Sequence, residues 1–300
     1  MNGMDNSYVK LTICIPTYNR KEKLLQCLDH LCPHITNEIL VIVRDNASSN
    51  YNCKEEIQPY VHKYGIQYVR NDVNVGMEGN IAKCFEFCET QWLWILGDDD
   101  WINSSAVKLV LDAIDKNPQA LFIKFNSYIN STTVGLDEFC LQMQPSYAFS
   151  NSYFISEGIH NLGIGKEDMI WHYKYMSTNI GQILRVLKHL ISNAETECVF
   201  IKDSILEDHG GNISWSHLEL VFSFLYVFDI FNEYKSKFKN NIFKCISRLS
   251  LAYIQGSNLS LKEKLYYAKI IVYKYGYINT LRYNLKQILS FYYNILIKNK

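Results

Sequence analysis

The stretch Trp92-Leu93-Trp94-Ile95-Leu96-Gly97-Asp98-Asp99-Asp100 decides the fold of this 300-residue chain. Its first five residues are large and apolar, which is typical of a strand buried on both faces. Three carboxylates follow at the end of that strand, and adjacent carboxylates repel one another unless a cation compensates them. Divalent cations such as Mg²⁺ and Mn²⁺ prefer carboxylate oxygens. Because open α/β sheets bind ligands outside the carboxyl ends of their strands, the stretch predicts a metal and phosphate site.

The three aspartates have a second interpretation, in which they only begin a helix. Asp and Asn are good N-caps, and acidic residues stabilise the first turn of a helix. Asn103, Ser104 and Ser105 could cap the next helix without any of the aspartates. Both interpretations stay open at this point, and the metal site is the leading hypothesis.

Residues 9 to 125 alternate between strand and helix patterns. Short apolar runs predict strands at 9–15, 39–43, 66–69, 92–96 and 120–125. Apolar residues at helical spacing predict helices at 21–31, 53–64, 80–88 and 105–116. Pro16 is expected to end the first strand. The alternation predicts an α/β fold with a Rossmann-like, mostly parallel sheet and helices on both faces.

The rest of the chain has a different pattern. Residues 126–217 combine short strand-like pieces with irregular segments, which are usually functional in a compact domain. Helical periodicity then predicts helices at 218–234, 241–255, 261–275 and 280–298. We therefore expect an α/β domain at residues 1–234, followed by a helical C-terminal region at residues 235–300.

Electric charge is unevenly distributed along the chain. Residues 235–300 hold thirteen Lys and Arg residues against one acid, Glu263, which gives +12, and the neutral total leaves −12 for residues 1–234. The basic end is also rich in Tyr, and basic amphipathic helices with interfacial aromatic residues lie on anionic membranes. We expect residues 235–300 to contact such a surface, the alternative being that they only pack on the α/β domain. Nucleic acid is not expected, because no recognised module is visible and the α/β part is acidic.

The cysteines and apolar runs bear on localisation. Nine cysteines are scattered without CxxC pairs or histidines at metal-ligand spacing, and the N-terminus lacks a secretory pattern. Both features favour a reducing cytosol. No uncharged apolar run reaches the roughly eighteen residues that span a bilayer. We expect a cytoplasmic protein that binds peripherally to the inner face of the plasma membrane.

Four segments in residues 9–125 resemble motifs of family 2 glycosyltransferases, which have the nucleotide-sugar-binding GT-A fold. Pro16-Thr17-Tyr18-Asn19-Arg20 is similar to the family's opening P-T-Y-N-R, and Asp45-Asn46-Ala47-Ser48 to its D-N-x-S segment. Asn74-Val75-Gly76 with Asn80 resembles the N-x-G…N segment, and Asp98-Asp99-Asp100 takes the place of the D-x-D motif. Any one motif is weak, but all four stand in the right order at strand ends. The resemblance is to family members of the bacterial surface-polysaccharide type.

The resemblance implies which residues bind a nucleotide-diphosphate sugar, by default a UDP-sugar. They would be Pro16, Thr17, Tyr18, Arg20, Asp45, Asn74, Gly76, Asn80, Asp98 and Asp99. Asp100 and Asp98 would hold Mn²⁺ or Mg²⁺. Gly97 stands where the family often has its first acid, so the D-x-D role falls to Asp98 and Asp100. Of these two we favour Asp100 on the metal and Asp98 toward the ribose. Asp45 would accept the imino N–H of uracil.

Each of these residues also has a plain structural interpretation. Asp45 can form an Asx-turn, Arg20 can begin a surface helix, and Asn80 can cap one. Asn74 and Gly76 can simply turn the chain.

The resemblance further implies an inverting transfer of a hexose to a hydroxyl of a glycan acceptor, which we expect to be lipid-linked. A general base removes the hydroxyl proton. Candidate segments are Glu167-Asp168, Glu207-Asp208 and Trp215-Ser216-His217-Leu218-Glu219. We favour His217, then Glu219, with Asp208 in reserve. The alternative is that His217 only begins a helix.

Two rival functions remain. The protein could be a catalytically inactive binder of a nucleotide sugar or glycan. A nucleotidyltransferase also uses strand-end carboxylates and a metal, but it would usually show a Gly-rich, basic first loop, which residues 16–19 are not.

Overall fold

The computed structural model describes residues 9–142, 155–207 and 259–278, together with 280, 281, 285 and 289. They belong to two compact units. The first unit contains the described residues of 9–135, 155–177 and 181–207, and the second contains the remainder. The predicted domain boundary at residue 234 lies outside the described residues and stays a prediction.

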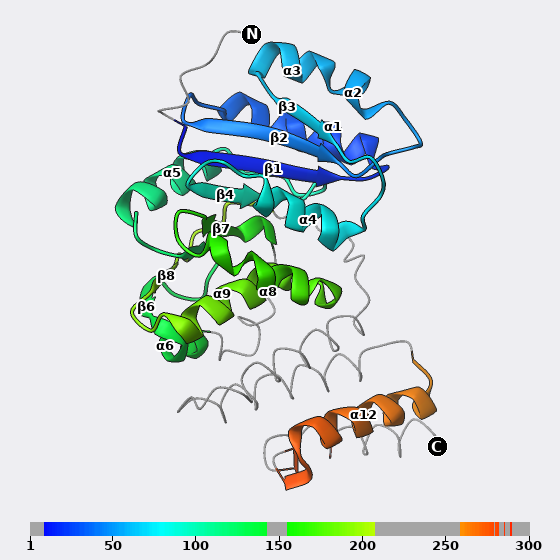
Figure 1. Ribbon diagram of the computed structural model, residues 1–300, viewed down its shortest axis with the longest axis vertical. Helices are drawn as coiled ribbons and strands as arrows, with labels where there is room; N and C mark the ends of the chain where they lie inside the picture. The colour runs from blue at the N-terminus through cyan, green and yellow to red at the C-terminus, as the bar shows by residue number, and fades with distance from the viewer. Residues whose placement is uncertain are drawn as a thin grey trace. The chain divides into compact units, whose positions relative to one another are not determined.

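An eight-stranded sheet forms the first unit, in the order β3-β2-β1-β4-β7-β5-β8-β6 (Figure 1). The strands are β1 (Leu11–Thr17), β2 (Ile39–Asp45), β3 (Gln67–Arg70), β4 (Trp92–Ile95), β5 (Phe122–Lys124), β6 (Ser131–Val134), β7 (Gly158–Asn161) and β8 (Glu197–Phe200). β1 to β4 are parallel, as are β5 and β8, whereas β7 is antiparallel to β4 and β5, and β6 to β8. The predicted mostly parallel sheet is therefore confirmed.

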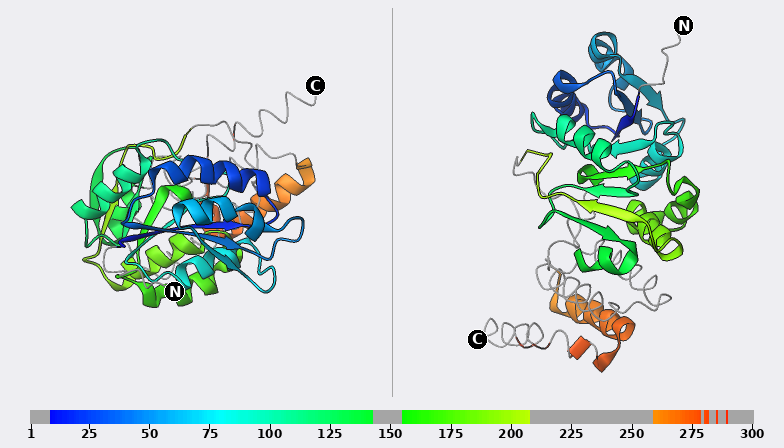
Figure 2. Two further views of the ribbon diagram at one scale, coloured as in Figure 1. Left: turned by 90° about the horizontal axis from the view of Figure 1, so that it is seen from above. Right: turned by 90° about the vertical axis from the view of Figure 1, so that its left-hand side faces the viewer.

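Helices cover both faces of the sheet (Figure 2). They are α1 (Lys21–Leu31), α2 (Cys53–Glu56), α3 (Gln58–Tyr64), α4 (Met77–Glu86), α5 (Ala106–Lys116), α8 (Met169–Lys174) and α9 (Gly181–Ser192). Leu28 of α1 and Val110 of α5 share a core with Ile13. Phe85 of α4 shares the opposite core with Cys14. Because successive side chains of a strand point to opposite faces, β1 supplies both cores.

Pro16 does not end the first strand, contrary to the sequence prediction. β1 continues to Thr17, and Pro16 pairs with Arg44 of β2. Pairing of β1 with β4 ends at Cys14. Pro16 therefore has one neighbouring strand, and its missing N–H is tolerated as on an edge strand.

One predicted helix, at 53–64, is two helices. α2 ends at Glu56, and Pro59 stands in the first turn of α3. Proline has no N–H to donate within a continuous helix but fits a first turn, so the chain restarts there.

The second unit contains α12 (Leu261–Tyr275), which confirms the predicted helix at 261–275. Ser260 and Glu263 form a capping box at its start, in which each side chain binds the other residue's backbone N–H. The predicted helices at 218–234 and 241–255 lie outside the described residues, as does most of 280–298. In the described part of the chain, no helix combines the length and apolar character needed to cross a membrane.

Candidate functional site

The carboxyl ends of four adjacent parallel strands meet at one edge of the sheet, which we call the carboxyl edge. β1 ends at Thr17, β2 at Asp45 and β3 at Arg70, while β4 leads into Asp98-Asp99-Asp100. The antiparallel β7 starts at the same edge, directly after the turn Ile155–Glu157. Most of the residues predicted to bind the donor therefore lie at or near this edge.

Asp98 is the buried member of the acidic triplet, with 3% of its surface exposed. The Thr17 hydroxyl donates to one of its oxygens at 2.7 Å, and Arg20 Nη1 donates to the other at 2.7 Å. Burial raises the pKa of Asp98 to about 6, although Arg20 and Thr17 act in the opposite direction. The site thus joins the first loop to the aspartates directly.

Asp99 and Asp100 have different partners. Arg20 forms an ion pair with Asp99, and Lys23 Nζ donates to it at 3.0 Å. Burial favours a raised pKa for Asp99, but these two cations outweigh it and lower the pKa. Asp100 accepts a hydrogen bond from the Ser156 hydroxyl at 2.5 Å. The aspartates are therefore structurally distinct, which the sequence did not show.

Asp45 is fully buried beneath Arg70. Its carboxylate accepts from the Ser48 N–H at 2.8 Å, the Tyr68 hydroxyl at 2.7 Å and Arg70 Nη1 at 2.5 Å. Burial favours a raised pKa, but these hydrogen bonds outweigh it and lower the pKa of Asp45. The Arg70 side chain is 45% exposed, so it presents positive charge to solvent above Asp45.

A network of asparagines holds the loop before α4. The Asn46 amide donates to Asn74 Oδ1 at 2.8 Å and to the Gly76 carbonyl at 3.1 Å. Asn71 Nδ2 donates to Asn46 Oδ1 at 2.9 Å and to Asn80 Oδ1 at 2.8 Å. Gly76 has φ +78°, which a residue with a side chain rarely adopts. The predicted residues Asn74, Gly76 and Asn80 thus shape one loop.

The first loop is fixed in a similar way. Asn19 has φ 56°, and its side-chain oxygen accepts from the N–H groups of Ser49 at 2.8 Å and Asn50 at 3.0 Å. Tyr18, between Thr17 and Asn19, is exposed. An exposed Tyr on a rigid loop offers an aromatic face at low entropic cost.

The residues at this edge fit a divalent cation through Asp100. Both oxygens of Asp98 are engaged by Thr17 and Arg20, and Asp99 is neutralised by Arg20 and Lys23. Asp100 is only half-buried. Mg²⁺-type sites commonly use one or two carboxylates and complete their coordination with substrate phosphates, so one suitably placed aspartate suffices.

A second cluster able to ligate a metal lies at the opposite edge of the sheet. The ligand atoms of Glu167, Asp168 and His189 lie within 4.8 Å of one another. Lys166 donates to the Cys88 carbonyl at 2.8 Å, which places this segment before the start of β4. His189 Nδ1 lies 2.5 Å from Asp168 Oδ2, and the buried Arg185 interacts electrostatically with both Asp168 and Glu167. Glu167-Asp168 therefore lies at the opposite end of β4 from the aspartate triplet, which argues against this segment as the base.

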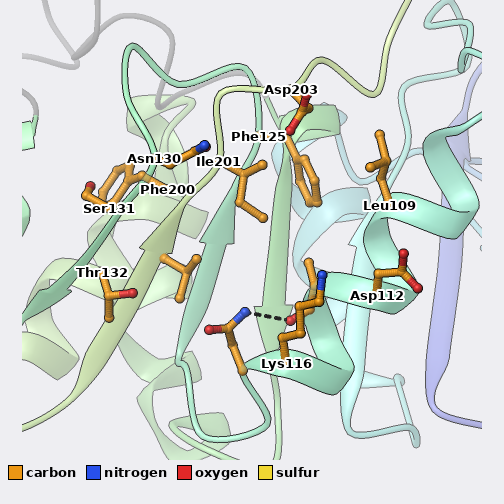
Figure 3. Close-up of a pocket in the computed structure, with 13 residues that line it drawn as sticks. Leu109, Asp112, Lys116, Phe125, Asn130, Ser131, Thr132, Phe200, Ile201 and Asp203 are labelled. Atoms are coloured by element: carbon orange, nitrogen blue, oxygen red, sulfur yellow. Dashed lines mark hydrogen bonds between the residues drawn. The ribbon is translucent and has the colours of Figure 1, made fainter.

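A pocket of about 460 Å³ lies between α5 and the strands β6 and β8 (Figure 3). Asp112 and Lys116 line it from α5, and Phe125, Ile201 and Asp203 line it from the segments that follow the strands. None of the aspartates of the triplet lines this pocket. We assign this pocket no role in donor binding.

The predicted base residues Asp208, His217 and Glu219 lie outside the described residues and stay predictions. The chain that leads to them passes the site, because the Glu207 N–H donates to the Trp101 carbonyl at 2.8 Å. Trp101 follows Asp100 directly.

Sequence reasoning missed Tyr68, Arg70, Asn71 and Ser156 at this edge. Arg70 had a usable signal, since it stands at the end of a predicted strand, as Asp45 does. Ser156 had none, because its segment showed no clear pattern and only the antiparallel pairing of β7 with β4 places it there.

The chain has a GT-A-type glycosyltransferase fold, with a mostly parallel sheet and carboxylates at its strand ends. Structures of S. aureus TarS share the fold. The TarS 1–349 complex with UDP-GlcNAc has a TM-score of 0.64 at 12% identity, covering 90% of this chain and 83% of that one. A second TarS structure has a TM-score of 0.61 at 13% identity, covering 85% and 46%.

Residues 12–210 match the profile described as "Glycosyl transferase family 2", and the chain belongs to that family. Abequosyltransferase RfbV of Salmonella typhimurium (strain LT2) is 30% identical over 109 residues, which are 35% of this chain and 32% of that protein. An uncharacterized glycosyltransferase of Haemophilus influenzae is 24% identical over 180 residues, 60% and 58% of the two chains. The chain thus matches less than two thirds of either relative's length.

Proposed function

We propose that this family 2 glycosyltransferase is an inverting enzyme that moves a hexose from a nucleotide-diphosphate donor to a hydroxyl of a glycan acceptor. One observation carries the proposal: Thr17, Asp45 and the triplet Asp98–Asp100 converge at the carboxyl ends of adjacent parallel strands, where ligands of such sheets bind. UDP is the default nucleotide, supported by the TarS structure of the same fold with UDP-GlcNAc.

The proposal gives each element of the edge a task. Asp45 and the exposed Arg70 above it recognise the base, and Tyr18 and Pro16 contact the nucleoside. Asn74, Gly76 and Asn80 shape the adjoining loop through Asn46 and Asn71. Arg20, already paired with Asp98 and Asp99, faces the phosphates.

We assign the cation to Asp100, with Asp98 on the ribose side. Both oxygens of Asp98 already accept a hydrogen bond, one from Thr17 and one from Arg20, which favours the ribose role for Asp98. A bound Mn²⁺ or Mg²⁺ would neutralise the diphosphate leaving group. The base that accepts the acceptor's proton belongs to the segment beyond Glu207, with His217 favoured over Glu219 and Asp208 in reserve.

The acceptor is proposed to be lipid-linked at an anionic membrane surface. α12 carries Lys262, Lys264 and Lys269. The same helix exposes large apolar or aromatic side chains, among them Leu265, Tyr266 and Tyr273, the last 90% exposed. Lysines beside exposed aromatic residues suit an anionic interface. Co-sedimentation with anionic and neutral vesicles tests this, and Lys262→Glu with Lys264→Glu should abolish the preference for anionic lipid; equal binding to both vesicle types contradicts it.

The donor site is tested by melting curves with a panel of nucleoside diphosphates, each with and without Mn²⁺. We expect one diphosphate to raise Tm with Mn²⁺ and far less without it. Asp100→Ala should remove the Mn²⁺-dependent part of this shift and abolish transfer while the fold persists. Asp112→Ala, on the surface of α5, is the matched control. Full activity of Asp100→Ala would overturn the assignment, and donor hydrolysis separates an enzyme from a mere binder.

A further inference from the structure

Asp100 is folded back over the backbone of Gly97. A Cβ placed on Gly97 would lie 2.6 Å from Asp100 Oδ2 and 3.4 Å from Ser156 Oγ. A separation of 2.6 Å between a methyl carbon and a carboxylate oxygen is far below van der Waals contact. An alanine at position 97 would therefore push the Asp100 carboxylate out of this position.

Ser156 holds the carboxylate in this position. The Gly97 N–H donates to Ser156 Oγ at 2.8 Å, and the Ser156 hydroxyl donates to Asp100 Oδ2 at 2.5 Å. Ser156 is 1% exposed, so water does not compete for these bonds. Hydrogen bonds linked in series strengthen each other, since accepting one bond makes the hydroxyl a better donor.

The backbone around Ser156 is fixed independently of Asp100. The Trp94 indole N–H donates to the Ser156 carbonyl at 2.8 Å. The next residue, Glu157, forms a buried ion pair with Lys124 and accepts from Asn126 Nδ2 at 2.8 Å. Ser156 is thus a rigid support that reaches Asp100 from another segment of the sheet.

We propose that Ser156 is the positioning residue for Asp100: together with Gly97, it sets the orientation of the carboxylate before cation and diphosphate arrive. This inference rests on the proposed role of Asp100 as the cation ligand. Partners that orient a metal-binding carboxylate typically contribute about 10- to 100-fold to metal affinity. Without Ser156, the Asp100 side chain must be ordered at the moment of binding, which lowers the affinity for the cation without altering the chemistry that follows.

The test is a Mn²⁺ titration in saturating UDP, with free Mn²⁺ followed by its electron paramagnetic resonance signal. Ser156→Ala should raise the apparent Kd for Mn²⁺ about 10- to 100-fold, and excess Mn²⁺ should restore most of the turnover. Ser127→Ala is the matched control, because the Ser127 hydroxyl binds the Lys124 carbonyl at 3.2 Å and not Asp100. An apparent Kd within twofold of the wild-type value would overturn the proposal, as would a loss of turnover that excess Mn²⁺ does not reverse.

Two further variants keep the result decisive. Gly97→Ala keeps the Ser156 hydroxyl but displaces the Asp100 carboxylate, so it should weaken Mn²⁺ binding in the same way. If Ser156→Ala does not fold, a wild-type-like Kd for Gly97→Ala would by itself refute the proposal. Failure of the proposed function has a different signature, since wild type and Asp100→Ala would then bind Mn²⁺ and UDP alike.

Discussion

Glu78 offers a quantitative test of the loop beside the proposed donor site. It stands in the first turn of α4 with 8% of its surface exposed, and within the described part of the chain its Oε2 has no hydrogen-bond partner. Burial raises its pKa from 4.5 to about 8. At neutral pH the folded protein therefore keeps this carboxyl protonated, whereas the unfolded chain ionises it.

The sign and size of the effect follow from proton binding. Below pH 4.5 both states hold the proton and Glu78 carries no penalty. Between pH 4.5 and about 8 only the folded state holds it, so the free energy of unfolding falls as pH rises. Each pH unit costs about 1.4 kcal/mol, which amounts to on the order of 5 kcal/mol over this window.

Glu78→Gln removes the titration while keeping the shape of the side chain. Urea unfolding followed by the fluorescence of the buried Trp92 and Trp94 should show that the variant gains stability relative to wild type by several kcal/mol between about pH 5 and about pH 8.5. Glu89→Gln, an exposed site just after α4, should show no such gain. If the difference between Glu78→Gln and wild type is the same at both pH values, the inferred burial of a neutral carboxyl is wrong.

Three further predictions concern ion pairs at the carboxyl edge. Arg20→Ala should lower the free energy of unfolding by roughly 2 kcal/mol, because it leaves Asp98 without its cation. The loss is smaller than for a fully buried pair because the Arg20 side chain is 37% exposed. Urea unfolding measures this loss, and Arg20→Lys should lose less stability. Lys124→Met should lower the free energy of unfolding by about 3–5 kcal/mol, because Glu157 then stays buried without its ion-pair partner. Adding Glu157→Gln should recover most of that loss, and a double-mutant cycle without coupling would contradict it. Because the pKa of Asp45 is lowered in the folded state, Asp45 stabilises the fold above its unfolded pKa of 3.8, and this contribution is lost as pH falls through the folded pKa. Asp45→Asn should therefore flatten the dependence of unfolding free energy on pH in the acid range. A pH profile parallel to that of wild type would argue against this.

Local patterns in the sequence predicted the first half of the sheet well. Continuous apolar runs located β1 to β4, and helical spacing located α1, α4 and α5 within a few residues. The strand-end rule then placed Thr17, Asp45 and Asp98 at one edge, because parallel strands present their carboxyl ends together. The periodicity of α12 was equally clear. These features depend on residues near one another in the chain.

What the sequence determined is therefore a parallel α/β core with acids at its strand ends, since side-chain periodicity reports directly which faces are buried. The tertiary structure alone decided how those acids differ. Asp98, Asp99 and Asp100 are identical in type and adjacent in sequence, but each has a different set of partners. Asp98 binds Thr17 and Arg20, Asp99 binds Arg20 and Lys23, and Asp100 binds Ser156. Three of these four partners stand more than 50 residues from Asp98–Asp100 on the N-terminal side, and Ser156 stands 56 residues beyond Asp100. Hydrogen bonds across such separations leave no periodic signal in the sequence, because they depend on strand order.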